Sequence, residues 1–181
     1  MQKDLPIKDI YTINLIKSYC LNKKDYRFLL FFLIGINTGL KVNEILELDV
    51  SDVRDKDYII IKQCLAGIKK RLPINKEIKE LIKLLTEKSD KNSPLFVSCR
   101  GKRLERTTVY NEFKTICEDL GLSEDYSIAS LRKTFGYHYY QQYKDLSFLQ
   151  WLFNQSTVVA TMEYIDIDEN LSSRFNPEFS L

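Results

Sequence analysis

An almost unbroken run of apolar residues, from Phe28 to Ile36, lies near the start of this 181-residue chain. A helix that is apolar all round has to be buried all round, so the run predicts a buried helix over residues 26–36 with the rest of the fold packed against it. Gly39 stands where that helix should stop, because glycine readily adopts the left-handed conformation of a helix end. The run is much shorter than the ~20 residues that cross a bilayer, so no membrane segment is expected.

The remaining patterns predict further helices around one small sheet. Apolar residues recur at near-helical spacing after Pro6 and Asp9, which suit the start of a helix. Helices are expected over residues 10–20, 75–88 and 107–120 and through most of the chain after 127. Strands are expected over 53–63 and 68–74, which would pair with each other, and over 95–98. The predicted fold class is therefore mainly α with a small antiparallel β-sheet (α+β).

Length and composition limit the organisation of the chain. A protein of 181 residues can bury one core but is too short for two substantial domains, so a single domain over residues 1–181 is expected. A content of 44% hydrophobic and 29% charged residues is ordinary for a globular protein. No basic-then-apolar signal peptide opens the sequence, so a cytoplasmic location is expected.

The cysteines show no pattern of metal ligation. The chain has four, scattered at Cys20, Cys64, Cys99 and Cys117, and one histidine, His138. Without ligand spacing, reduced thiols in the core or at the surface are the better interpretation, and no metal site is expected.

The charges are unevenly distributed although the net charge is only +2. Residues 62–103 contain twelve Lys or Arg and four Asp or Glu, whereas residues 141–181 contain two basic and six acidic side chains. A basic half and an acidic tail would suit a DNA-binding face and a protein-contact face. A solvated, lysine-rich helix surface explains the same pattern equally well.

Five segments share their order and spacing with one known family. They are Asn37–Leu48, Lys69–Ile74, Leu95–Ser98, Ser130–His138 and Leu152–Ile165. Together they resemble the catalytic domain of the tyrosine recombinase (phage integrase) family over nearly the whole chain. The resemblance implies a double-stranded DNA partner and phosphotyrosine chemistry that needs no metal, organic cofactor or small-molecule substrate. Because only residues 1–6 precede the match, the N-terminal core-binding domain that members usually carry is expected to be absent.

Strand exchange in such a family begins when a tyrosine attacks a phosphodiester. The negative charge that develops at phosphorus has to be stabilised, for which the planar fork of arginine is suited, and the departing 5′-oxygen has to receive a proton. The resemblance implies six positions for these tasks: two arginines, a lysine, two histidine-like donors and the nucleophile.

Two of these six positions are intact and others are altered. The resemblance places the nucleophile at Tyr164 and the second arginine at Arg132. Lys41 occupies the first arginine's position, with the charge but without bidentate geometry. Gln155 occupies a histidine-like position and can donate a hydrogen bond without shuttling protons. Ala129 falls where a histidine is usual, and its methyl group can neither donate a hydrogen bond nor transfer a proton.

The family's lysine falls on the predicted hairpin, and counting back from Pro73 places it at Leu65. Other lysines of this segment could reach the site instead, namely Lys62, Lys69 or Lys70. Four basic residues are expected to contact the DNA backbone: Lys69, Lys70, Arg71 and Lys133. A solvated hairpin tip is the alternative for the first three.

Two other residues have open roles. Glu44 follows Lys41 by three residues and could pair with it on a helix or support the active site. His138 lies six residues beyond Arg132, about 240° further round a helix of 3.6 residues per turn. It is therefore expected to face away from the phosphate side.

Three functions remain open at this point. The first is a DNA-binding protein of integrase descent, from a mobile element or prophage, whose strand-exchange activity is weak or lost. The second is an active site-specific recombinase with Tyr164 as nucleophile, and the third is an interaction module that keeps only the fold. The tail after Tyr164 could expose Ile165, Ile167 and Leu171 to a neighbouring copy on DNA, or fold back onto its own core.

Overall fold

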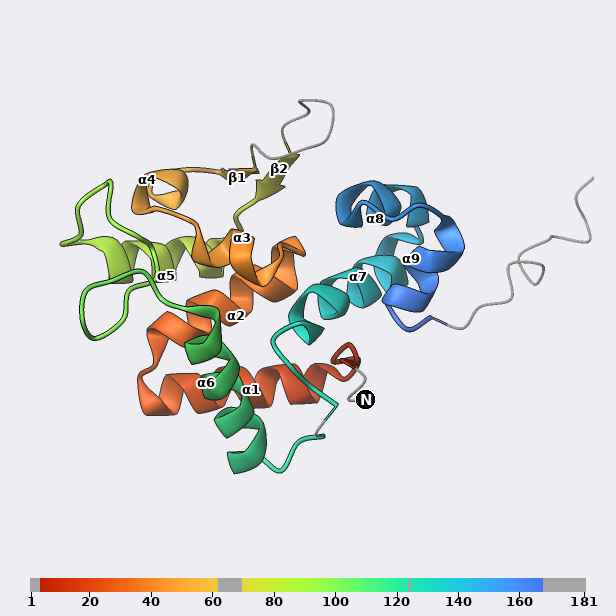
Figure 1. Cartoon of the computed structure of the whole chain (residues 1–181), viewed down its shortest axis with the longest axis horizontal. Helices are drawn as coiled ribbons and strands as arrows, with labels where there is room; N and C mark the ends of the chain where they lie inside the picture. Colours follow the sequence, from red (N-terminus) through yellow and green to blue (C-terminus); the bar gives the residue numbers. More distant parts are fainter. Residues whose placement is uncertain (1–3, 62–69, 124, 168–181) are drawn as a thin grey trace, which may run out of the picture.

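The computed structural model describes residues 4–61, 70–123 and 125–167. They form a mainly helical fold with one two-stranded antiparallel sheet, which confirms the predicted fold class (Figure 1). In chain order the elements are α1 Ile10–Lys23, α2 Tyr26–Thr38, α3 Val42–Leu46, α4 Val50–Val53, β1 Tyr58–Ile61, β2 Lys70–Pro73, α5 Lys76–Thr86, α6 Arg106–Asp119, α7 Ser130–Tyr143, α8 Leu146–Phe153 and α9 Val158–Tyr164.

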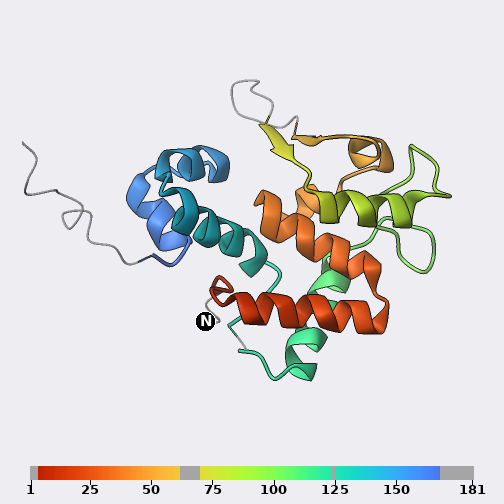
Figure 2. The same cartoon turned by 180° about the vertical axis from the view of Figure 1, so that it is seen from behind.

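Helix α2 is the centre of the fold, as the apolar run predicted. Every residue from Phe28 to Gly35 is buried, and α1, α5 and α7 pack around the helix (Figure 2). The carboxylate of Asp25 caps its start by accepting a hydrogen bond from the backbone amide of Phe28. Gly39 ends it at a φ of +65°. A Cβ at Gly39 would lie 2.6 Å from Cδ1 of Phe135, so only glycine allows the end of α2 to approach α7 this closely.

Side-chain caps fix the starts of two other helices. Asp9 accepts hydrogen bonds from the backbone amides of Tyr11 and Thr12 at the start of α1. Asn75 accepts one from the amide of Ile78 at the start of α5, over 2.9 Å. These helices and α6 begin and end within a few residues of the predicted bounds, because their capping and periodicity signals are local.

The sheet is shorter than predicted at its first strand. Strands β1 and β2 pair antiparallel, with Ile59 opposite Leu72 and both side chains buried. The predicted start of the strand at Val53 is wrong, because residues 50–53 form the helical turn α4. Asp52 stabilises that turn by accepting a hydrogen bond from the backbone amide of Asp49.

The predicted strand over 95–98 is also wrong. Two isolated bridges, Asp49 with Pro94 and Val97 with Arg103, occupy this region in place of a ladder. The first two residues of the segment are buried in the core. The apolar pattern that predicted a strand therefore reflects a loop packed against the core.

Helices α7, α8 and α9 form one side of the molecule, away from α4 and α5 (Figure 1). Gly136 of α7 lies against the residue that follows α9, since a Cβ there would be 2.5 Å from Cγ2 of Ile165 and 2.7 Å from Cε2 of Phe153. Ile165 is fully buried, which agrees with the second of the two alternatives for this segment. It folds back onto its own core, while Leu171 lies outside the described residues.

We expect Gly136→Ala to lower the free energy of unfolding by about 1–3 kcal/mol, because the added methyl group overpacks this contact. For a domain of this size the melting temperature should fall by about 2–4 °C for each kcal/mol. Thermal denaturation followed by circular dichroism measures the change. Gln141→Ala, on the exposed face of the same helix, is the control and should leave the melting temperature almost unchanged. An unchanged melting temperature of Gly136→Ala would contradict the close packing of α7 on Ile165.

Within the described part of the chain, Cys20 and Cys117 are buried thiols and Cys99 is an exposed one. Burial raises the pKa of Cys20 to about 12 and that of Cys117 to about 11, so both stay protonated at neutral pH. The described residues include no cluster of side chains suited to a metal ion. None of their helices has the length and apolar character required to cross a membrane.

Candidate active site

A pocket of about 390 Å³ lies where the starts of α3 and α6 meet helices α7, α8 and α9. Four of the predicted site residues line it together, although they come from four separate segments: Lys41, Arg132, Gln155 and Tyr164. The rest of the lining is Val42, Asn43, Arg106, Ile128, Ala129 and Phe153. The tertiary structure therefore brings together the residues that the sequence placed up to 123 positions apart.

Lys41 reaches the pocket because α2 ends at the left-handed residue Gly39 and Lys41, two residues later, immediately precedes α3. The carboxylate of Glu44 accepts a hydrogen bond from the backbone amide of Lys41 over 2.7 Å, which fixes the first turn of α3. The Lys41 side chain is exposed at the pocket. Glu44 thus contacts the backbone of Lys41, and its carboxylate also lies 3.9 Å from the guanidinium of Arg132.

Arg132 is the most enclosed charged residue of the site, with 9% of its surface exposed. Its guanidinium donates hydrogen bonds to the carbonyl oxygens of Gly39 and, over 3.4 Å, Leu152. It also lies 4.5 Å from the centre of the Phe153 ring, within range of a cation–π contact. The guanidinium is therefore held in one orientation by the ends of α2 and α8.

The surroundings of Arg132 shift the pKa of its guanidinium in two opposite directions. Burial lowers the pKa of its guanidinium, while Tyr164 and Glu44 raise it. The reference pKa of arginine is so high that the group remains charged at neutral pH. A fixed positive charge in a largely dry setting attracts an anion more strongly than an exposed one does.

Tyr164 ends helix α9 and is half-buried. Its ring packs on Phe153 at 5.2 Å between centroids, and Nζ of Lys133 lies 5.4 Å from the ring centre. Its hydroxyl group lies close enough to the guanidinium of Arg132 for each group to shift the pKa of the other. Burial raises the pKa of Tyr164, and the positive charge of Arg132 opposes part of that rise. The hydroxyl is neutral at pH 7 and has to lose its proton if it attacks a phosphate.

The raised pKa of Tyr164 predicts a loss of stability at high pH. Because the pKa in the folded state exceeds that of the unfolded chain, the neutral phenol stabilises the fold below about pH 10, and this contribution is lost as the pH rises further. We expect Tyr164→Phe to lose less stability than the unaltered protein between about pH 9 and 11. Urea unfolding at several pH values measures this, and parallel curves for the two proteins would contradict it.

Gln155 and Ala129 form two further walls of the pocket. Asn154 ends α8 in the left-handed conformation at a φ of +58°, which turns the half-buried Gln155 toward the pocket. Ala129 is held in the turn before α7, where its amide donates to Oγ of Ser127 over 3.0 Å. Its methyl group, next to Ile128, makes this wall apolar.

The basic residues expected on DNA occupy different surroundings. Nζ of Lys70 donates to the carbonyl oxygens of Trp151 and Leu152, at 3.3 and 2.8 Å, so it joins the hairpin to the end of α8. Arg71 is exposed on β2, and Lys133 rests on the ring of Tyr164. Three residues of the hairpin hypothesis lie outside the described part of the chain: Lys62, Leu65 and Lys69.

His138 lies away from the pocket, as its position on the helix predicted. Its Nε2 is 2.9 Å from the carbonyl oxygen of Ile7, and its ring meets Tyr137 edge to face. It anchors the start of the chain to α7.

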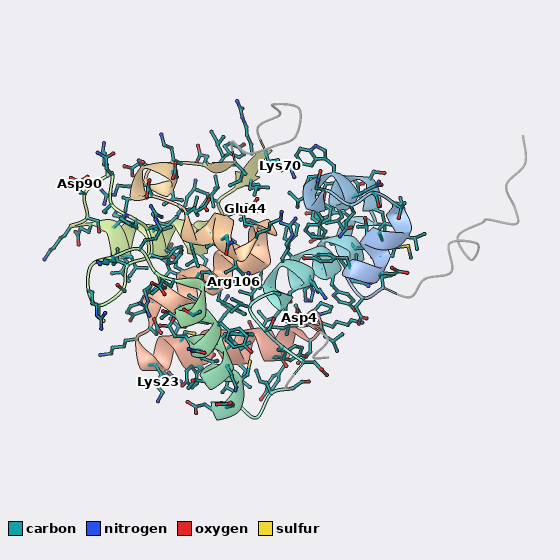
Figure 3. All side chains as sticks on the ribbon, viewed as in Figure 1. Asp4, Lys23, Glu44, Lys70, Asp90 and Arg106 are labelled. Atoms are coloured by element: carbon teal, nitrogen blue, oxygen red, sulfur yellow. The ribbon has the colours of Figure 1, made fainter. Side chains whose placement is uncertain are left out.

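Sequence reasoning missed one charged residue of the lining. Arg106 is the first residue of α6 and contributes a third cation to the pocket (Figure 3). The sequence showed that a helix begins near this point, but the face on which its first side chain lies depends on the packing of α6 against α3.

Comparison of the sequence with known families and proteins gives a consistent result. Residues 6–170 match the model of the phage integrase family. The chain is 36% identical over 166 residues to "Probable integrase/recombinase YoeC" of Bacillus subtilis, covering 91% of each protein.

Two solved structures share the fold. The XerA recombinase superposes with a TM-score of 0.74 at 20% identity, over 94% of this chain and 63% of that one. A lambda integrase dimer bound to a COC' core site gives 0.68 at 20% identity, over 100% of this chain and 52% of that one. The chain thus spans between half and two thirds of these larger proteins.

Proposed function

Because the chain belongs to the phage integrase family, we propose that it binds duplex DNA with a backbone phosphate in the pocket around Arg132, and that strand cleavage by Tyr164 is weak or lost. The observation that carries this proposal is the composition of that pocket. It combines three cations and a tyrosine hydroxyl with an apolar wall at Ala129.

The cations suit a phosphate diester. Lys41, Arg106 and Arg132 line one pocket, and no Asp or Glu is among the described residues of its lining. Charged donors that are fixed in place before an anion arrives stabilise it without reorganisation. Contacts of this kind to the DNA backbone give affinity that does not depend on base sequence.

The same pocket is poor in groups that transfer protons. Its lining holds neither imidazole nor carboxyl group among the described residues, and the amide of Gln155 can form hydrogen bonds but cannot transfer a proton. A positioned acid or base is worth about 10²–10⁴ in rate, and a lost charge-stabilising donor about 10²–10³. Cleavage by Tyr164 is accordingly proposed to be slow or absent.

One observation favours an active recombinase as the second candidate. Tyr164 lines the same pocket as Arg132, whose positive charge opposes the rise of the Tyr164 pKa, and a nucleophile beside a bound phosphate would need such a neighbour. A lysine of segment 62–69, outside the described residues, would then supply the proton to the leaving oxygen. The two candidates share DNA binding and differ in covalent chemistry.

The test uses nicked and intact duplexes from the chain's own genomic neighbourhood. Binding is measured by fluorescence anisotropy over a range of salt concentrations, and covalent adducts are sought by denaturing electrophoresis with Tyr164→Phe as control. We expect binding that weakens steeply with salt and little or no Tyr164-dependent adduct. A rapidly formed adduct would establish the second candidate, and the absence of duplex binding would leave an interaction module.

Assembly on DNA is a further part of the proposal, because the related lambda integrase was crystallised as a DNA-bound dimer. The residues after 167 would provide the contact between copies. Light scattering of the protein with and without a duplex tests this, and one copy per duplex at saturation would contradict it.

A further inference from the structure

We propose that the guanidinium of Arg106 binds the DNA phosphate in this pocket; the inference rests on the proposed function in DNA binding. Arg106 lines the pocket with an exposed side chain. Among the described residues no hydrogen bond or ion pair engages it. Its planar fork of donors is therefore available to an incoming oxyanion.

The other two cations of the pocket are less suited to this contact. Arg132 is nearly enclosed, and its two terminal guanidinium nitrogens already donate to Gly39 and Leu152, with Glu44 3.9 Å from one of them. Lys41 carries a compact charge that attracts a phosphate without fixing its orientation. Arg106 is thus the lining residue with a free bidentate fork.

The position of Arg106 is fixed by the segment that precedes it. The guanidinium of Arg103 donates to the carbonyl oxygens of Leu46 and Leu48, at 2.8 and 3.2 Å, and forms an ion pair with Asp49 at 2.6 Å. Leu104 is buried, with 4% of its surface exposed. These contacts tie the start of α6 to α3 and α4.

Helix α6 also packs directly against α3. Arg106 therefore lines the same pocket as the start of α3, where Lys41 stands in place of the expected arginine. Figure 3 labels Arg106 near the middle of the molecule, with Glu44 above it. The guanidinium that is missing from position 41 is in this way supplied from a different helix.

The first experiment compares Arg106→Ala and Arg106→Lys with Arg100→Ala, an exposed arginine outside the pocket lining that removes the same charge. The probe is a fluorescein-labelled duplex of about 30 base pairs from the chain's genomic neighbourhood. We expect Arg106→Ala to weaken binding about tenfold or more, as for loss of a charge-assisted hydrogen bond. Arg106→Lys should recover only part of the loss.

The dependence of binding on salt distinguishes a phosphate contact from a general effect of charge. Each lost phosphate contact reduces the slope of log K against log salt concentration by about 0.9. We expect this reduction for Arg106→Ala and little change for Arg100→Ala. Equal slopes and affinities in the Arg106 and Arg100 variants would overturn the inference while leaving DNA binding itself intact.

A second experiment tests the site without DNA. Inorganic phosphate is titrated into the full chain labelled with ¹⁵N at the arginine side chains, and the Nε–Hε resonance of Arg106 is assigned by its absence from Arg106→Lys. We expect this resonance to shift with phosphate, whereas that of Arg100 stays in place. A shift in a chain that does not bind duplexes would refute the proposed function alone, and an unmoved Arg106 resonance would refute the inference.

Discussion

Replacement of Ala129 by histidine is expected to raise the rate of covalent adduct formation between Tyr164 and DNA by about 100-fold or more. Ala129 lines the pocket that also contains Arg132 and Tyr164, so an imidazole there can exchange a proton with the reacting groups. A positioned acid or base contributes about 10²–10⁴ in rate. The effect is measured as the initial rate of adduct formation on a nicked duplex, by denaturing electrophoresis.

Two controls make this gain specific. Ala129→Leu adds bulk to the same wall without an imidazole and should give no gain, and Ala129→His combined with Tyr164→Phe should give no adduct. The gain should also follow the titration of an imidazole, whose usual pKa is about 6.5. No increase in Ala129→His, in a variant that still binds duplex DNA, would show that something other than proton transfer limits the site.

Replacement of Arg132 by alanine is expected to have the largest effect on stability. The side chain is nearly enclosed and bridges the end of α2, at Gly39, with the end of α8, at Leu152. Its removal deprives the carbonyl oxygen of Gly39 of this donor and leaves an empty space beside Phe153, while the carbonyl oxygen of Leu152 keeps its hydrogen bond from Lys70. We expect a loss of about 2–4 kcal/mol in the free energy of unfolding.

Arg132→Ala should also weaken salt-sensitive DNA binding, since the pocket loses its one enclosed positive charge. Urea unfolding and fluorescence anisotropy measure the two effects separately. Lys133→Ala is the matched control, because it removes the adjacent charge from a half-buried position on the same helix and should cost much less stability. Similar losses of stability in the two variants would contradict the bridging role of Arg132.

Much of the fold was accessible from local patterns. The buried helix α2, its end at Gly39 and the caps at Asp9 and Asn75 were all visible in the sequence, because each depends on residues within one or two turns. The errors arose where burial and not backbone pairing set the apolar pattern, as in the loop at Leu95 and the turn at Val53.

The candidate site was accessible only in part. The order of motifs pointed to Tyr164 and Arg132, and the structure places both in one pocket. The order of motifs did not reveal that Lys70 donates hydrogen bonds to the end of α8, or that Arg106 lines the pocket. Contacts over 82 positions depend on how helices pack, which spacing along the chain does not specify.

The sequence by itself predicted the fold class and the approximate bounds of α1, α2, α5 and α6, because periodicity and caps are local properties. The order of its motifs also selected the tyrosine and the arginine that the structure places in one pocket. The tertiary structure decided which cations line one pocket and which of them already form hydrogen bonds within the protein. It also decided which apolar residues are buried, such as Ile165. Those properties follow from close packing between segments that are distant in the chain, because the size of a single side chain can set the distance between two helices.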